Sequence, residues 1–374
     1  MSHFQRLLKL AVVAGPMMLG ACGGGTSSDV EMPASSELAL STGEDASSSG
    51  ATTTTTTAGN AADAPNLFKL SHDGLSAFNG DIAAFLDRIK DAVDGAPGWS
   101  GTGKLVLVKT DSDAVFRLTF ERAKLSDIQY DDTDDVPGDE SVTDAQTPLA
   151  TTLIAARFTI EIKKPTEDDS AYRLAARGHR LHLAGDSVGA GVLVLYRARV
   201  LDVLPSLFTG NEQIAIRFDH RFKVRREAVR YHATDANGNS VPAAWVYRRL
   251  DGANLNAGSL RFAAIADLPN LPVSGNLPEQ VTLIEQWAKT DAGLVARAHA
   301  ELSGGDLGSD TLDVTECMDG IDQIGYRNVK LSDGTTYSDG SHGDPSACHP
   351  FDQDITPPKA NDDTMPAAAT PAQS

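Results

Sequence analysis

The stretch "VTLIEQWAKTDAGLVARAHAEL", residues 281–302, decides the fold class. On both sides of Asp291-Ala292-Gly293, apolar side chains tend to alternate with polar ones, as in strands that bury one face. A short polar turn with a glycine between two such runs is typical of a β-hairpin. Residues 281–290 and 294–302 are therefore predicted to form two antiparallel strands.

The same pattern recurs through most of the chain. Hairpins are predicted for residues 104–125, 150–183 and 228–249, each with a polar turn near its middle. No alternation of strands with helices is visible, so a parallel sheet is not expected. The predicted fold is mainly β, a large antiparallel meander that forms either a sandwich or a curved, barrel-like sheet.

One segment has the period of a helix. In "NGDIAAFLDRIKDAV", residues 79–93, the apolar side chains Ile82, Phe85, Leu86 and Ile89 recur every three or four positions. Asn79 or Asp81 is a suitable cap for its first turn. The sequence therefore predicts one N-terminal amphipathic helix.

The first residues, "MSHFQRLLKLAVVAGPMMLGAC", have the parts of an export signal: a short basic segment, an apolar run and small residues before a cleavage site. Leu19-Gly20-Ala21-Cys22 also resembles the lipobox of bacterial lipoproteins. That resemblance implies lipid on Cys22, anchoring in the outer membrane and no aspartate-type retention signal, since Gly23 follows the cysteine. The alternative is an ordinary secretory peptide with a chance cysteine.

Composition divides the chain into four parts. Residues 1–21 are the predicted lipoprotein signal peptide, and 22–65 the lipidated cysteine with a disordered tether rich in Ser, Thr and Gly. Residues 66–352 are predicted to be one β-rich domain. Residues 353–374 are predicted to be a disordered tail.

Cys317 and Cys348 are the two cysteines left if Cys22 carries lipid. In an oxidising compartment such a pair is expected to form a disulfide. The alternative is a metal site that adds His342 and His349, although their spacing matches no zinc pattern. No cofactor is predicted.

Gly185-Asp186-Ser187-Val188-Gly189 satisfies the G-x-S-x-G pattern of a serine nucleophile. A nucleophile elbow needs a helix directly after it, on a mostly parallel sheet. Here the following run, residues 190–200, alternates like the return strand of a hairpin. We therefore expect a hairpin loop and no enzymatic activity, with a serine hydrolase using Ser187 as the alternative.

A candidate anion-binding face comes from "QIAIRFDHRFKVRREAVRY", residues 213–231. Read as one strand, it places Arg217, Arg221, Lys223 and Arg225 on the face opposite its apolar side chains. The alternative is that these cations pair with acids on neighbouring strands or on an acidic loop. The formal net charge of −19 disfavours nucleic acid as a general partner. An envelope protein or an anionic glycan is the expected partner, besides the membrane that the lipid would enter.

The acidic loop is residues 125–149, which hold eight acidic residues and no basic one. Such a run is typical of a solvated loop. Five of its aspartates offer a calcium site as the alternative, but they lack the frame of an EF-hand; they are Asp131, Asp132, Asp134, Asp135 and Asp139.

The C-terminal part of the chain resembles a group of uncharacterised bacterial lipoproteins. The resemblance rests on "WAKTDAGLVARAHAELSGGDL", "VTECMDG" and "GDPSACHPF" within residues 280–350, with Met318 where that group tends to have tryptophan. It implies a lipid-anchored, β-rich domain with one disulfide, and no catalytic residue can be carried over. The expected role is binding or structural at the cell envelope; a carrier of an apolar ligand, held between sheet and helix, is a further alternative.

Overall fold

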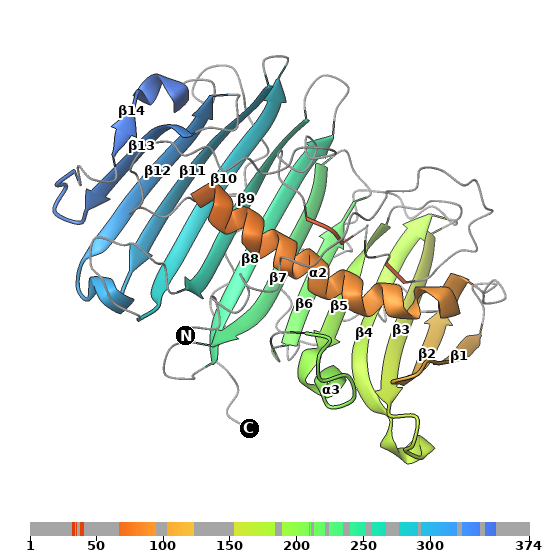
Figure 1. Cartoon of the computed structure of the whole chain (residues 1–374). Helices are drawn as coiled ribbons and strands as arrows, with labels where there is room; N and C mark the ends of the chain where they lie inside the picture. The colour runs from red at the N-terminus through yellow and green to blue at the C-terminus, as the bar shows by residue number, and fades with distance from the viewer. Residues whose placement is uncertain are drawn as a thin grey trace. The chain divides into compact units, whose positions relative to one another are not determined.

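The structure is a computed structural model of the 374-residue chain (Figure 1). The residues that it describes are 32–33, 35, 38–40, 67–94, 103–122, 153–183, 189–208, 210, 213–220, 224–234, 240–251, 256–266, 277–290, 293–319, 324–336 and 341–348. The fold is mainly β and antiparallel with a helix near its N-terminus, which confirms the predicted class.

The chain divides into two compact units, where the sequence suggested one domain over 66–352. The first unit holds Ala77–Arg221 and the described residues before position 40. Its strands pair antiparallel in chain order; they are β1 (Lys104–Thr110), β2 (Val115–Arg122), β3 (Leu153–Lys163), β4 (Arg173–Leu183), β5 (Gly189–Tyr196) and β6 (Gln213–Asp219). A 3-10 turn, η4 (Asp169–Ala171), precedes β4, and a short helix, α3 (Arg197–Leu201), follows β5.

The second unit holds Leu40–Ser76 and the described residues from Phe222 onward. Its strands also run in chain order; they are β7 (Val224–Thr234), β8 (Ser240–Asp251), β9 (Asn256–Ala266), β10 (Glu279–Thr290), β11 (Gly293–Ser303), β12 (Thr311–Asp319), β13 (Ile324–Leu331) and β14 (His342–Gly343). Two 3-10 turns are η5 (Gly305–Leu307) and η6 (Pro345–Cys348). The hairpin predicted at 281–302 is β10 with β11, whose register places Thr290 opposite Gly293.

The amphipathic helix is α2 (Leu67–Asp94), drawn in orange in Figure 1. It begins twelve positions before Asn79, so the prediction that Asn79 or Asp81 caps it is wrong. Its residues up to Ser76 belong to the second unit, and those from Ala77 onward to the first. Among the described helices, none is both long and apolar enough to cross a membrane.

The core of the first unit is a row of direct cross-strand partners on β2 to β6: Phe120, Phe158, Gly178, Leu193 and Ile216. The four apolar side chains of this row are buried. A Cβ on Gly178 would lie 2.7 Å from Cζ of Phe158, so the row packs only because that position lacks a side chain.

Helix α2 contributes to the core of the first unit through its buried apolar side chains. Ile82, Phe85 and Ile89 are all fully buried, and the Phe85 ring lies 6.3 Å from that of Phe208. A buried ion pair of 2.8 Å between Arg197 of α3 and Asp81 joins the two helices. The apolar stripe of the sequence is therefore the packed face of α2.

The core of the second unit is a comparable row on β9 to β13. Phe262, Leu283, Ala300, Val314 and Val329 are direct cross-strand partners, and all five are buried. Each alternates along its strand with residues of the opposite face, as the sequence predicts for half-buried strands.

Part of the predicted tether is not disordered. Met32 and Leu38 are buried in the first unit, and Ser35 Oγ donates a hydrogen bond of 2.5 Å to Asp87 Oδ1 on α2. Met32 and Leu38 have mostly polar neighbours in the sequence. The average composition of residues 22–65 therefore does not reveal that these two side chains are buried. The remainder of the tether, the signal peptide and the tail 353–374 lie outside the described residues.

Candidate functional site

The face of the first-unit sheet that is opposite the core row carries a concentration of cationic side chains. Arg157 on β3 pairs with His179 on β4, His179 with Val192 on β5, and Val192 with Arg217 on β6. Direct cross-strand partners point to the same face, so these residues form a row. Arg177 lies two positions from His179 and shares this face. We call Arg157, Arg177, His179 and Arg217 the arginine–histidine row.

His179 is uncharged at neutral pH. Burial is the main cause, and the positive charges of Arg157 and Arg217 add to it, together lowering the pKa of His179 to about 4. The two arginines therefore lie close enough to His179 for their fields to act on it. The positive charge of the row comes from its arginines alone.

A buried apolar patch lies between these cations. Val192, Val194 and Ala215 are buried on this face, with the Tyr196 ring packed against them. The Arg177 guanidinium lies 6.0 Å from the centroid of the Tyr196 ring, and that of Arg199 lies 4.5 Å from it. Stacking on a ring orients a guanidinium and leaves its N–H donors directed outward from the ring edge.

Another arginine of the same unit, on β2, also stacks on a tyrosine ring. The Arg117 guanidinium lies 4.0 Å from the Tyr172 ring centroid and makes a bidentate pair with Glu161, at 2.7 and 2.8 Å. Because this arginine already has a carboxylate partner in the chain, its charge is balanced locally. Arg117 is therefore excluded from the row.

The row is chemically suited to bind anionic groups. Guanidinium donors form paired hydrogen bonds with carboxylates and phosphates, whereas His179 is buried and offers little surface to a ligand. None of the four members is an acid, but Glu121 on β2 lies directly opposite Arg157, Asp219 shares the face of Arg217 on β6, and each member has further interactions with other parts of the chain. Its members come from β3, β4 and β6, so a ligand that binds them all must extend across several strands.

The anion-binding face predicted from 213–231 needs correction, because the segment is not one strand. β6 ends at Asp219 and β7 begins at Val224, and the two strands belong to different units. Of the predicted residues, Arg217 is in the row and Arg225 is on β7, while Arg221 and Lys223 lie outside the described residues. Alternation through His220 and Phe222 conceals this break in the sequence.

Arg157, Arg177 and His179 were missed as site residues because they come from other strands. The feature that brings these residues together is the pairing register of β3 and β4. That register can be predicted from a sequence only if the length of the turn and the position of the bulge are known. That register shifts between Ile160 and Glu161, where a bulge inserts one extra residue into β4. A regular hairpin drawn without the bulge would pair different residues.

Ser187 lies outside the described residues, but the strands on both sides of it are described. β4 and β5 pair antiparallel with His182 opposite Gly189, so residues 184–188 connect two strands of a hairpin. No helix begins at Gly189, whereas a nucleophile elbow requires one there. The predicted return strand is shorter than expected, since Arg197–Leu201 is the helix α3.

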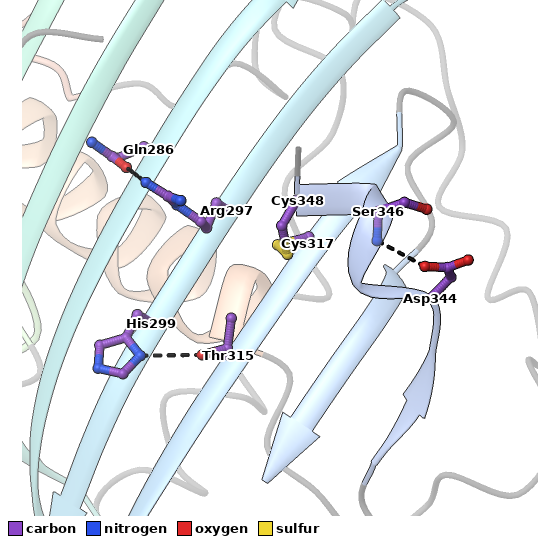
Figure 2. Close-up of a disulfide and its surroundings, with 8 residues drawn as sticks. All are labelled: Gln286, Arg297, His299, Thr315, Cys317, Asp344, Ser346 and Cys348. Carbon is purple, nitrogen blue, oxygen red and sulfur yellow. Dashed lines mark hydrogen bonds between the residues drawn. A yellow bond between two sulfur atoms is a disulfide. The ribbon is translucent and has the colours of Figure 1, made fainter. Parts of the chain in front are cut away.

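Cys317 and Cys348 form the predicted disulfide, with 5.3 Å between their Cα atoms (Figure 2). Cys317 is fully buried on β12, and Cys348 ends η6. Thiolate ligation by this pair is therefore not available, and the alternative metal site with His342 is wrong. No group of metal-binding side chains occurs among the described residues; His349 and the aspartates of 125–149 lie outside them.

Buried charges on the core face of the second unit hold the start of α2. Glu316 on β12 accepts a 2.8 Å hydrogen bond from the Leu67 backbone N–H and a 2.7 Å one from Arg327 Nε. On β10, Glu285 accepts a hydrogen bond from Ser71 Oγ. The first turn of α2 has no acidic residue of its own, and the Glu316 carboxyl supplies a hydrogen-bond acceptor for its first backbone N–H group.

Burial is the dominant influence on Glu316. It raises the pKa of this carboxyl to about 7, against the opposing effects of Arg327 and the backbone N–H groups of Leu67 and Phe68. The group is enclosed by the chain and offers no surface to a ligand. We therefore assign Glu316, with its partner Arg327, a role in positioning the start of α2.

Cys22 lies outside the described residues, so its lipidation remains a prediction. No protein-family model, curated protein or solved structure matches the chain.

Proposed function

We propose that this protein is a lipid-anchored lipoprotein of the cell envelope that binds an anionic envelope component through the arginine–histidine row. The observation that carries the proposal is that arginines of three strands share one face around a buried apolar patch. Proteins use such arginines to recognise carboxylate and phosphate groups. The function is binding, without a chemical step.

The location is supported by the sequence of the N-terminus and by the cysteines. The "LGAC" box after a short apolar run is the sequence pattern of a lipoprotein signal. A disulfide between Cys317 and Cys348 is consistent with an oxidising compartment. Both features favour export over a role inside the cell.

Packing favours a binding surface over a carrier of apolar ligands. Leu67, Leu75, Ile82 and Phe85, the apolar side chains that would line a cavity beneath α2, are each fully buried. Their burial supports the interpretation that this face of α2 packs against the chain itself. The hairpin geometry around Ser187 likewise favours binding over hydrolysis.

The test is binding of the full chain to a carboxylated polysaccharide, polygalacturonate, with neutral dextran as the comparison. Arg157→Ala and Arg217→Ala should each weaken polygalacturonate binding about tenfold, since each removes a charge-assisted contact. Arg297→Ala is the matched control: like Arg217, Arg297 is a half-buried arginine on a strand, and it is hydrogen-bonded at 2.9 Å to Gln286 of the second unit. It should bind like the wild type.

Two results would refute the proposal. One is equal binding of dextran and polygalacturonate, because charge would then have no role. The other is an equal loss of affinity in Arg157→Ala and Arg297→Ala, because the row would then be no more important than any other arginine. Inorganic phosphate as a competitor distinguishes a ligand recognised by single phosphates from one recognised as a chain of charges.

A further inference from the structure

The Tyr196 ring orients a cation that the arginine–histidine row does not include. The guanidinium of Arg199, on α3, lies 4.5 Å from the ring centroid, and that of Arg177 lies 6.0 Å from the same centroid. Tyr196 ends β5, and its ring packs against the buried apolar patch of the candidate site. Arg199 therefore extends the cationic surface of the first unit beyond the row, toward the end of β5.

The guanidinium of Arg199 differs from those of the row in its partners. Arg199 is exposed, and within the described part of the chain no acid pairs with it, not even Asp202 three positions away. Each member of the row, in contrast, has further interactions with the chain. A guanidinium stacked on a tyrosine is already oriented and keeps its N–H donors for a ligand.

The two ends of this cationic surface are far apart. Val192, the partner of His179, is four residues from Tyr196 along β5, which corresponds to about 13 Å of strand. Across the sheet, Arg157 on β3 and Arg217 on β6 are separated by three strand spacings, about 14 Å. A carboxylate lies only about 2.8 Å from the guanidinium nitrogen that it contacts. A ligand that uses both ends must therefore carry several anionic groups along an extended chain.

The side chains between the row and Arg199 carry no charge. They are Val194 and Ala215 of the buried patch and the half-buried Tyr196 ring. A polyphosphate has a charge on every unit, whereas in a polyuronate an uncharged sugar ring separates successive carboxylates. Cations separated by an apolar and aromatic stretch therefore complement a carboxylated polysaccharide better than a polyphosphate.

We infer that Arg199 is a further ligand-binding residue, and that the ligand is a linear carboxylated polysaccharide extending from the arginine–histidine row along β5 to α3, an assignment that rests on the proposed function and adds its ligand class. When one carboxylate of such a chain is bound at the row, another is held near Arg199 at a high effective concentration. Affinity should therefore rise steeply with chain length until both ends of the surface are engaged.

The test is calorimetric titration of the full chain with galacturonate and with an oligogalacturonate of ten units. The wild type should bind the oligomer at least about 100-fold more tightly than the monomer. Arg199→Ala should weaken oligomer binding about tenfold and leave monomer binding unchanged, since the row alone binds a single carboxylate. Because Arg199 is exposed and alanine favours helices, the variant should keep its fold.

Lys164→Ala is the matched control, because Lys164 is an exposed cation of the same unit and its loss changes the net charge equally. It should bind the oligomer like the wild type; weakening equal to that of Arg199→Ala would reduce the effect to net charge and overturn the inference. If Arg157→Ala weakens oligomer binding and Arg199→Ala does not, the proposed function stands and the extension to α3 is wrong. Tighter binding of a ten-unit polyphosphate overturns the ligand class. Absence of binding to every probe refutes the proposed function as well.

Discussion

Replacing Cys317 and Cys348 by alanine should lower the free energy of unfolding by about 3–4 kcal/mol. The two residues are 31 positions apart, and the chain-entropy relation for a closed loop of that size gives a value in this range. Apart from the bond, the described part of this segment is held by the short pairing of β14 with β13 and by hydrogen bonds such as that from the Val329 N–H to Ser341 Oγ. No residue of η6 is buried, and its hydrogen bonds include that from the Ser346 N–H to Asp344 Oδ1, at 2.9 Å (Figure 2).

The consequence is local as well as global. Without the bond, η6 and β14 should be cut by protease first, while β10 to β12 keep contacts such as Arg297 with Gln286 and His299 with Thr315. Urea titration and limited proteolysis measure the two effects, and chemically reduced wild type is the matched control. A loss below about 1 kcal/mol, or uniform cleavage across the second unit, would refute the reasoning.

Four further predictions concern other parts of the chain. Cys22→Ser should prevent lipidation and membrane retention, measured by incorporation of labelled palmitate; equal retention would refute it. Ser187→Ala should leave stability unchanged, and the wild type should not react with a fluorophosphonate probe. Labelling of the wild type that the variant loses would show that Ser187 is a nucleophile and refute the prediction. Because burial raises the pKa of Glu316 from 4.5 to about 7, its contribution to stability is present below pH 4.5 and is lost as the pH rises to about 7; Glu316→Gln should remove this slope in urea titrations. The lowered pKa of His179 has the opposite effect: stability is lost as the pH falls from 6.5 to about 4, because the unfolded chain takes up a proton that the folded chain does not. His179→Asn should therefore lose less stability in acid than the wild type.

Hairpins were predictable because their cause is local. The alternation in residues 281–302 and the turn at Asp291-Ala292-Gly293 lie within one short stretch, and β10 and β11 follow them closely. The start of α2 was missed although Asn66, a residue type that favours helix N-caps, directly precedes Leu67. The hydrogen bond that holds this end was not predictable, because its acceptor Glu316 is 249 positions away from Leu67.

The candidate site was only partly predictable for a similar reason. Arg217 was identified from the strand pattern, but its neighbours Arg157 and His179 depend on the pairing of β3 to β6. A bulge at Ile160 and Glu161 changes that pairing without any glycine or proline to mark it. Apolar alternation through His220 and Phe222 also concealed the end of β6.

The long separation between Leu67 and Glu316 has a consequence for the order of folding. A chain made from its N-terminus presents α2 long before β12 exists, so the start of the helix, which Glu316 holds, must wait for its partner. Contacts this distant in sequence form late, since a large loop must close first. Until residue 316 has emerged, the part of α2 up to Ser76 lacks its partners in the second unit and is the kind of exposed segment that chaperones bind. Nascent chains that end before β12 should therefore be aggregation-prone, whatever the state of their hairpins.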